Sequence, residues 1–205
     1  EGTVHPLNDT FFPTIDPNNP YELTEDERAV MNSLSASIIN SERLQTHIRY
    51  MFSHGALYKR INGNLLFHGC IPMDENGDFL PVDIYGAKCA GRALMDHLDK
   101  QIRASYFSPE KIKKYGKPGD LMWYLWLAKD SPLFGKEKMT TFERLFIDDK
   151  ASHKEHVRPY YKLINSKEPC ENILREFGLD PSHSKILNGH VPVKIKNGES
   201  PIKGG

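Results

Sequence analysis

Asn64-Leu65-Leu66-Phe67-His68-Gly69 and Lys185-Ile186-Leu187-Asn188-Gly189-His190 are the two stretches that best indicate the architecture of this sequence. Each is a short apolar run that ends in a histidine beside a glycine, and such a run favours a β-strand. A strand ending this way places an imidazole at a sheet edge, where the glycine lets backbone or ligand approach closely. Neutral imidazole is the commonest metal ligand in proteins. The two histidines are therefore either a metal site assembled from separate strands or ordinary loop residues.

The residues up to and including the first of these strands predict an extended connector, two helices and a β-hairpin. Four prolines in residues 1–23 indicate an extended connector. Thr24-Glu25-Asp26-Glu27 is a capping box that opens a helix toward Ile39, and a second helix starts at Asn40 or Ser41 and ends near Gly55. Residues 24–55 would then be a helical hairpin, which could serve as an inserted cap. The dipeptide Asn62-Gly63 predicts a tight turn between strands at 56–61 and 64–68.

The rest of the chain mixes helices with short strands. The patterns predict a strand pair near 82–88 and helices over 90–106, from Ser108-Pro109-Glu110 onward, over 120–128 and over 170–177, with a last strand at 193–196. The helix over 120–128 is the most apolar stretch, so we expect Trp123 and Trp126 in the core and not as a substrate platform. Residues 131–161 are crowded with charge, which fits a functional loop or a solvated surface equally well.

Composition limits the class of protein. The chain has 205 residues with 27 basic and 27 acidic side chains, and this balance argues against a nucleic-acid partner. No apolar run approaches the 18 residues of a membrane span, so we expect no membrane partner. Three widely spaced cysteines, Cys70, Cys89 and Cys170, fit free thiols in a reducing cytoplasm better than disulfides. A zinc site that includes Cys70 has no Cys-x-x-Cys spacing to support it.

Several longer strings carry a family resemblance. The segment 64–73 (Asn-Leu-Leu-Phe-His-Gly-Cys-Ile-Pro-Met), the segments 133–136 and 138–144, and the segment 188–194 (Asn-Gly-His-Val-Pro-Val-Lys) resemble the class III (Firmicutes-type) fructose-1,6-bisphosphatases. The resemblance extends from 12–17 to 199–203. That family is similar to the calcineurin-like metallophosphoesterases, which hydrolyse phosphate esters at a two-metal centre. It implies an α/β fold, a β-sandwich flanked by helices, of which residues 24–205 would be the incomplete C-terminal part.

The resemblance also implies which ligands this chain supplies. Of the five ligand-bearing segments of metallophosphoesterases, only the last two are found, as His68 and His190. The Asp-x-His, Gly-Asp-x-x-Asp and Gly-Asn-His segments are not found, and Pro192 stands where a Gly-His-x-His form would have its second histidine. We therefore expect the catalytic residues and the remaining ligands upstream of Glu1, in an N-terminal part of the same protein. The family also continues into another strand before its own Gly-Gly, so we expect missing residues between Lys203 and Gly204.

In this interpretation both histidines bind one cation of a dinuclear site, for which Mn²⁺ or Mg²⁺ suits the carboxylate-rich ligand set. Arg144, Lys138 and Lys194 could hold substrate phosphate, but for each residue alone a surface salt bridge is the favoured interpretation. The implied protein is a cytoplasmic hydrolase of gluconeogenesis, and so of carbohydrate metabolism, that converts fructose 1,6-bisphosphate to fructose 6-phosphate and could form homo-oligomers. The alternatives are a metallophosphoesterase for another phosphate ester, or a non-catalytic binding or assembly domain that keeps the fold. The fragment alone should be inactive.

Overall fold

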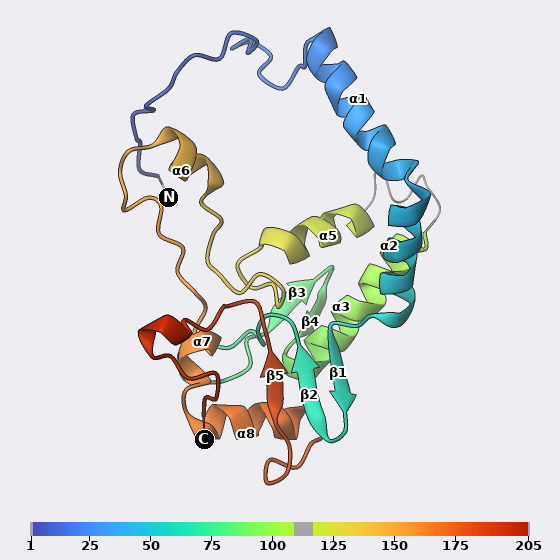
Figure 1. The fold of residues 1–205 in the computed structure, drawn as a ribbon, viewed down its shortest axis with the longest axis vertical. Helices are drawn as coiled ribbons and strands as arrows, with labels where there is room; N and C mark the ends of the chain where they lie inside the picture. Colours follow the sequence, from blue (N-terminus) through green and yellow to red (C-terminus); the bar gives the residue numbers. More distant parts are fainter. Residues whose placement is uncertain (1, 109–116, 205) are drawn as a thin grey trace. The chain divides into compact units, whose positions relative to one another are not determined.

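A computed structural model describes residues 2–108 and 117–204 of the chain (Figure 1). The chain divides into two compact units. Unit 1 comprises Glu1–Gly55 and Thr140–Lys154, and unit 2 comprises Ala56–Met139 and Glu155–Gly205. Every buried apolar side chain within the described ranges lies in unit 2. Unit 2 therefore contains the hydrophobic core, and each unit is described by itself below.

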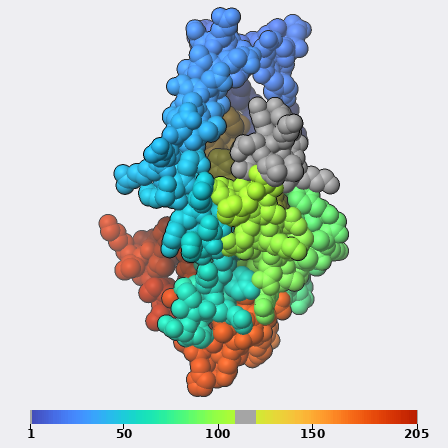
Figure 2. All heavy atoms as spheres, turned by 90° about the vertical axis from the view of Figure 1, so that its right-hand side faces the viewer, coloured from blue at the N-terminus to red at the C-terminus, as the bar shows by residue number. Residues whose placement is uncertain are grey.

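Unit 1 is built from helices. α1 (Glu25–Ile39) begins at the predicted capping box: the Glu27 amide donates to the Thr24 hydroxyl over 3.3 Å, and the Thr24 amide donates to the Glu27 carboxylate over 2.8 Å. α2 (Glu42–His54) follows with Ser41 as its N-cap, and α6 (Thr141–Phe146) is the third helix of the unit. Neither α1 nor α2 contains a buried residue, and their side chains stand on the surface in blue in Figure 2. The two predicted helices are confirmed, but the predicted hairpin is wrong. In Figure 1 α2 continues from the end of α1 and does not fold back beside it, since neither helix has a buried face to pack on the other. Residues 2–23 contain turns but no helix or strand.

A three-stranded sheet is the centre of unit 2. β1 (Tyr58–Ile61) and β2 (Asn64–Phe67) form the predicted hairpin, whose turn has Asn62 at φ 51° and Gly63 at φ 74°. The two positive φ values suit an Asn-Gly turn between twisted strands. β5 (Ile186–Asn188) pairs in parallel with β2, with Phe67 opposite Asn188 at the end of the ladder (Figure 1). Two strands more than 100 residues apart in sequence therefore end at the same edge of the sheet.

Helices cover one face of this sheet. Leu65 and Phe67 point from β2 into the core, and the Phe67 ring lies 6.0 Å from that of Tyr160 in α7 (Tyr160–Leu163). The Tyr58 ring packs edge to face on Phe177, at the end of α8 (Lys167–Glu176). On the opposite face Leu66 is half-buried, and Leu187 beside it in the ladder is 52% exposed. The described residues of unit 2 thus cover the sheet on one side only.

A second layer extends the core. β3 (Val82–Ile84) and β4 (Ala87–Cys89) form the predicted strand pair, and α3 (Gly91–Tyr106) follows with Leu94, Leu98 and Ile102 buried on one face. α5 (Lys117–Leu127) packs on α3. α8 begins three residues earlier than predicted and ends at Glu176, two residues before Gly178, whose φ of 70° is left-handed. The helix expected from Pro109 lies outside the described residues.

Two further predictions of local structure are wrong. Trp123 and Trp126 are 59% and 60% exposed, because Leu121 and Leu125 (one helical turn apart) form the buried face of α5 and leave the indoles on the other side. The last strand at 193–196 is replaced by a 3-10 helix, η1 (Ile195–Asn197). There the Lys194 amide donates to the Glu199 carboxylate over 2.9 Å, so a local turn satisfies the backbone that a strand partner would have bonded.

The mixed α/β class is confirmed, with a three-stranded and a two-stranded sheet in the described part of the chain. Within those residues, the helices are too short or too polar to cross a membrane.

Candidate metal site

The candidate site lies at the edge where β2 and β5 end. His68 follows Phe67 and His190 follows Asn188 by two residues, so parallel pairing brings both histidines to this edge. The Gly189 amide donates to the His68 carbonyl over 3.0 Å and extends the ladder by one bond. His190 itself has φ 65°, a left-handed conformation that is uncommon for a residue with a side chain. The sequence places the histidines, and the register of the ladder brings them together.

The imidazole rings of His68 and His190 lie in contact. His68 Nε2 lies 3.1 Å from His190 Nδ1, and the ring centroids are 5.0 Å apart at an interplanar angle of 79°. The prediction that they converge within about 5 Å is confirmed. Two nitrogens at this separation either share a proton or can bind one cation, since bonds of about 2.1 Å to both would enclose nearly a right angle, as an octahedral site requires. The pair therefore fits the metal that the sequence predicts.

The surroundings keep His190 neutral. Partial burial lowers the pKa of His190 below its ordinary value of 6.5, and the nearby His68 and Lys136 lower it further, against a backbone hydrogen bond at Phe134 that raises it. The Nδ1 atom of His190 is the one that faces His68, and only a neutral imidazole can donate a lone pair to a metal. The lowered pKa therefore favours the form of His190 that can bind a cation between the two rings.

The residues after His68 pack closely against the backbone at Pro132. The Cys70 amide donates to the Pro132 carbonyl over 2.9 Å, and Gly69 lies so close to that carbonyl that a Cβ atom on it would be 2.3 Å from the oxygen. Burial raises the pKa of the Cys70 thiol to about 12, and this thiol donates a hydrogen bond to the Ser131 carbonyl. Cys70 belongs to no group of three or more candidate metal ligands among the described residues, so nothing there supports the zinc site considered from the sequence.

Further ligands are not found beside the pair. No group of three or more His, Cys, Asp or Glu side chains that could hold a metal ion occurs in residues 2–108 and 117–204. Two imidazoles without a carboxylate form only part of a site for a hard divalent cation. A complete site needs ligands from elsewhere in the protein.

The three predicted phosphate-binding residues lie in different units. Arg144 belongs to unit 1, where its Nε donates to the Thr140 hydroxyl over 2.9 Å and its Nη2 donates to the His153 carbonyl over 3.1 Å. Lys138 and Lys194 belong to unit 2 and are exposed. Lys194 lines a hollow of about 300 Å³ that also reaches Asn188 and Gly189, next to His190. Lys194 is thus the predicted cation that shares a cavity with the histidine loop.

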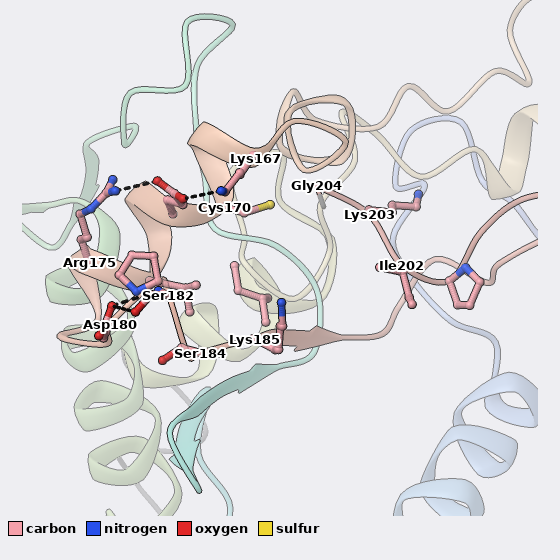
Figure 3. A pocket seen from close by; sticks show the side chains of 15 residues that line it. Lys167, Cys170, Arg175, Asp180, Ser182, Ser184, Lys185, Ile202, Lys203 and Gly204 are labelled. Carbon is pink, nitrogen blue, oxygen red and sulfur yellow. Dashed lines mark hydrogen bonds and ion pairs between the residues drawn. The ribbon is translucent and has the colours of Figure 1, made fainter.

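A larger hollow lies between α8 and the C-terminal segment (Figure 3). Its side chains include Lys167 and Arg175, which both pair with Glu171 at 3.5 Å and 2.7 Å. Asp180 accepts hydrogen bonds from the Ser182 amide and hydroxyl, and no histidine lines this hollow within the described part of the chain. Because Glu171 pairs with both cations and offsets one of their two charges, this hollow is a weaker anion site than its basic residues suggest.

Sequence reasoning missed one residue that shapes the site. The Asn188 side-chain amide donates to the Gly69 carbonyl over 3.0 Å, and its place two residues before His190 is the one signal that could have indicated it. The close backbone approach predicted for the glycine beside each histidine is confirmed at Gly69, which packs on Pro132.

Comparison with known proteins identifies the family of this α/β chain, in which two histidines form the candidate metal site. The family described as Firmicute fructose-1,6-bisphosphatase matches residues 1–205. The chain belongs to this family.

Curated relatives carry the name fructose-1,6-bisphosphatase class 3. The chain is 54% identical over 203 residues to the one from Clostridium acetobutylicum, with 99% of this chain and 30% of the relative covered. It is 50% identical over 202 residues to the one from Fusobacterium nucleatum, with 98% and 31% covered. The chain thus spans about 30% of the length of the curated relatives it matches. No solved structure matches the chain.

Proposed function

We propose that the intact protein is a class 3 fructose-1,6-bisphosphatase, a cytoplasmic enzyme of gluconeogenesis that hydrolyses fructose 1,6-bisphosphate to fructose 6-phosphate and phosphate. The observation that carries the proposal is the pair of imidazoles, 3.1 Å apart, in a chain that matches the bisphosphatase family along its whole length. The substrate is the one that the relatives are named for.

In this proposal His68 and His190 bind one cation of a dinuclear centre, Mn²⁺ or Mg²⁺. Such a centre, when bound, neutralises phosphate oxygens and generates a hydroxide nucleophile near neutral pH. The neutral state of His190 keeps its lone pair available, and the β2–β5 register holds both rings at one edge. The carboxylate ligands and the second cation's site would come from the part of the longer protein that this chain does not include. That part is the first partner of this chain, and a homo-oligomer is a further possibility.

Substrate binding would use cations near the metal pair. Lys194 is the best-supported candidate, because its hollow opens beside Asn188 and Gly189. A bisphosphate has a second phosphate that the metal centre does not hold, and ammonium or guanidinium groups bind phosphate oxygens. Lys138 and Arg144 stay proposed as further contacts.

The fold of the whole domain would be a calcineurin-like sandwich flanked by helices. The uncovered face of the three-stranded sheet supports this, since Leu66, Leu187 and Ile61 lie there and a second sheet would bury them. Residues 24–205 would be its C-terminal part, with 24–55 as a helical cap and 1–23 as a connector.

The test uses the full-length protein and separates the proposal from its alternatives. His68→Ala and His190→Ala should each lower Mn²⁺-dependent kcat/KM for fructose 1,6-bisphosphate by about 100-fold or more, because each removes a ligand. His156→Ala is the matched control, because His156 is exposed in the same unit and should be dispensable.

Two results would favour the alternatives. Equal or faster turnover of nitrophenyl phosphate by the wild type would indicate a phosphatase for another ester. Absence of any Mn²⁺-dependent hydrolysis by the full-length protein would indicate a binding or assembly domain.

A further inference from the structure

The loops that carry the two histidines lie beyond the last ladder pair. β2 and β5 stop at Phe67 and Asn188, so the strand pairing does not itself fix His68 and His190. Two hydrogen bonds link the β2 and β5 segments beyond that last pair. One is the backbone bond from the Gly189 amide to the His68 carbonyl, which any residue at position 189 except proline could make. The other runs from the Asn188 carboxamide to the Gly69 carbonyl over 3.0 Å, and it needs this particular side chain.

The backbone turn at His190 needs a hydrogen bond of this kind to hold it in place. The left-handed φ of His190 persists only where the surroundings over-determine it. The turn is tight, since the Val191 amide donates to the Gly189 carbonyl over 2.7 Å. On the other loop, Gly69 is fixed against Pro132. Asn188 therefore anchors a strained, partly exposed turn to a rigid one.

We propose that Asn188 is a positioning residue for the metal-binding pair: its carboxamide sets the spacing of the His68 and His190 rings by tying their loops together. This inference rests on the proposed role of the two histidines as ligands. Asn188 acts here through its amide nitrogen, which donates to the Gly69 carbonyl. Residues that orient metal ligands typically change metal affinity by about 10–100-fold when they are removed.

The same pair of strands supplies a matched control. At the opposite end of the β2–β5 pairing, the Asn64 Oδ1 atom accepts from the Lys185 amide over 2.8 Å. Asn64 and Asn188 are thus two asparagines that each link β2 and β5 segments by one side-chain hydrogen bond. Substituting either with alanine removes such a bond, but only Asn188 adjoins the histidines. A role in strand pairing alone would make the two substitutions equivalent.

The experiment measures Mn²⁺ affinity of the full-length protein by calorimetry, with thermal unfolding of each variant recorded alongside. Asn188→Ala should raise the Kd for Mn²⁺ by about tenfold, whereas Asn64→Ala should change it by less than about twofold, as expected for a site it does not touch. Equal effects on Kd from both variants, or none from Asn188→Ala, would overturn the proposal. Asn188→Gln, which keeps the carboxamide on a longer side chain, serves if Asn188→Ala does not fold, and its Kd should then lie within tenfold of the wild type.

His68→Ala distinguishes failure of this inference from failure of the proposed function. If His68→Ala weakens Mn²⁺ binding and Asn188→Ala does not, the histidines are ligands and Asn188 does not position them. If His68→Ala also leaves Mn²⁺ affinity unchanged, the proposed ligand pair itself is wrong, and with it the role of Asn188.

Discussion

Gly69→Ala should push the His68 loop away from the Pro132 and Leu133 carbonyls on which Gly69 packs. The φ of Gly69 is not in the left-handed region, so alanine adopts the same backbone without torsional strain. The obstacle is space: the new Cβ would lie 2.3 Å from the Pro132 carbonyl oxygen and 3.1 Å from that of Leu133. Ordinary contacts begin at 3.4 Å, so the two loops have to move apart by about 1.1 Å.

The magnitude follows from this displacement. Overpacking of this kind costs about 1–3 kcal/mol. The same movement lengthens the 2.9 Å hydrogen bond from the buried Cys70 to the Pro132 carbonyl, and a buried amide left unpaired costs about 1–3 kcal/mol. The two costs share one carbonyl and do not add fully, and alanine lowers the entropy of the unfolded chain by about 0.4–1 kcal/mol. We expect a net local destabilisation of about 2 kcal/mol.

Hydrogen exchange in the full-length protein measures this locally. A loss of about 2 kcal/mol in the free energy of opening corresponds to exchange of the Cys70 amide about 30 times faster. Gly189→Ala is the control, because its Cβ would meet only the His68 carbonyl, at an ordinary 3.8 Å, and its φ is also outside the left-handed region. The reasoning is refuted if Gly69→Ala leaves exchange at Cys70 as slow as Gly189→Ala does.

Three other outcomes are expected. The 205-residue chain alone should release no phosphate from fructose 1,6-bisphosphate, since two imidazoles without a bridging carboxylate lack the two-metal clamp; Mn²⁺-dependent release above a no-enzyme blank would contradict this. Arg144→Ala in the full-length enzyme should raise KM for the bisphosphate with kcat mostly kept and with no effect on a monophosphate ester; equal damage to both substrates would assign its bonds to Thr140 and His153 a structural role. Because the folded state lowers the pKa of His190, the unfolded chain binds the proton first as pH falls through 6.5, so the free energy of unfolding should fall between about pH 7.5 and 5.5. His190→Gln should flatten this pH dependence of the free energy of unfolding, measured by urea titrations. An unchanged pH dependence in the variant would contradict its assignment to His190.

Local signals were sufficient for most elements of the fold. The capping box at Thr24 and the Asn62-Gly63 turn specify their structures through bonds and dihedral angles within a few residues. The Trp123 and Trp126 prediction failed because apolar composition does not say which face of a helix will meet a neighbour, and α3 happens to meet Leu121 and Leu125. The strand expected at 193–196 failed because alternation alone supplies no partner, and Glu199 supplies a local bond instead.

The two candidate ligands could be found from sequence, since each histidine closes an apolar run beside a glycine. That His68 and His190 share one edge depends on the parallel register of β2 with β5, which pairing across more than 100 residues decides. Their 3.1 Å separation further requires the Asn188–Gly69 bond and the packing of Gly69 on Pro132. Sequence thus determined the chemistry of the site, because residue type and local pattern carry it. Only the tertiary structure decided the distances, because they arise from contacts between segments that no local pattern connects.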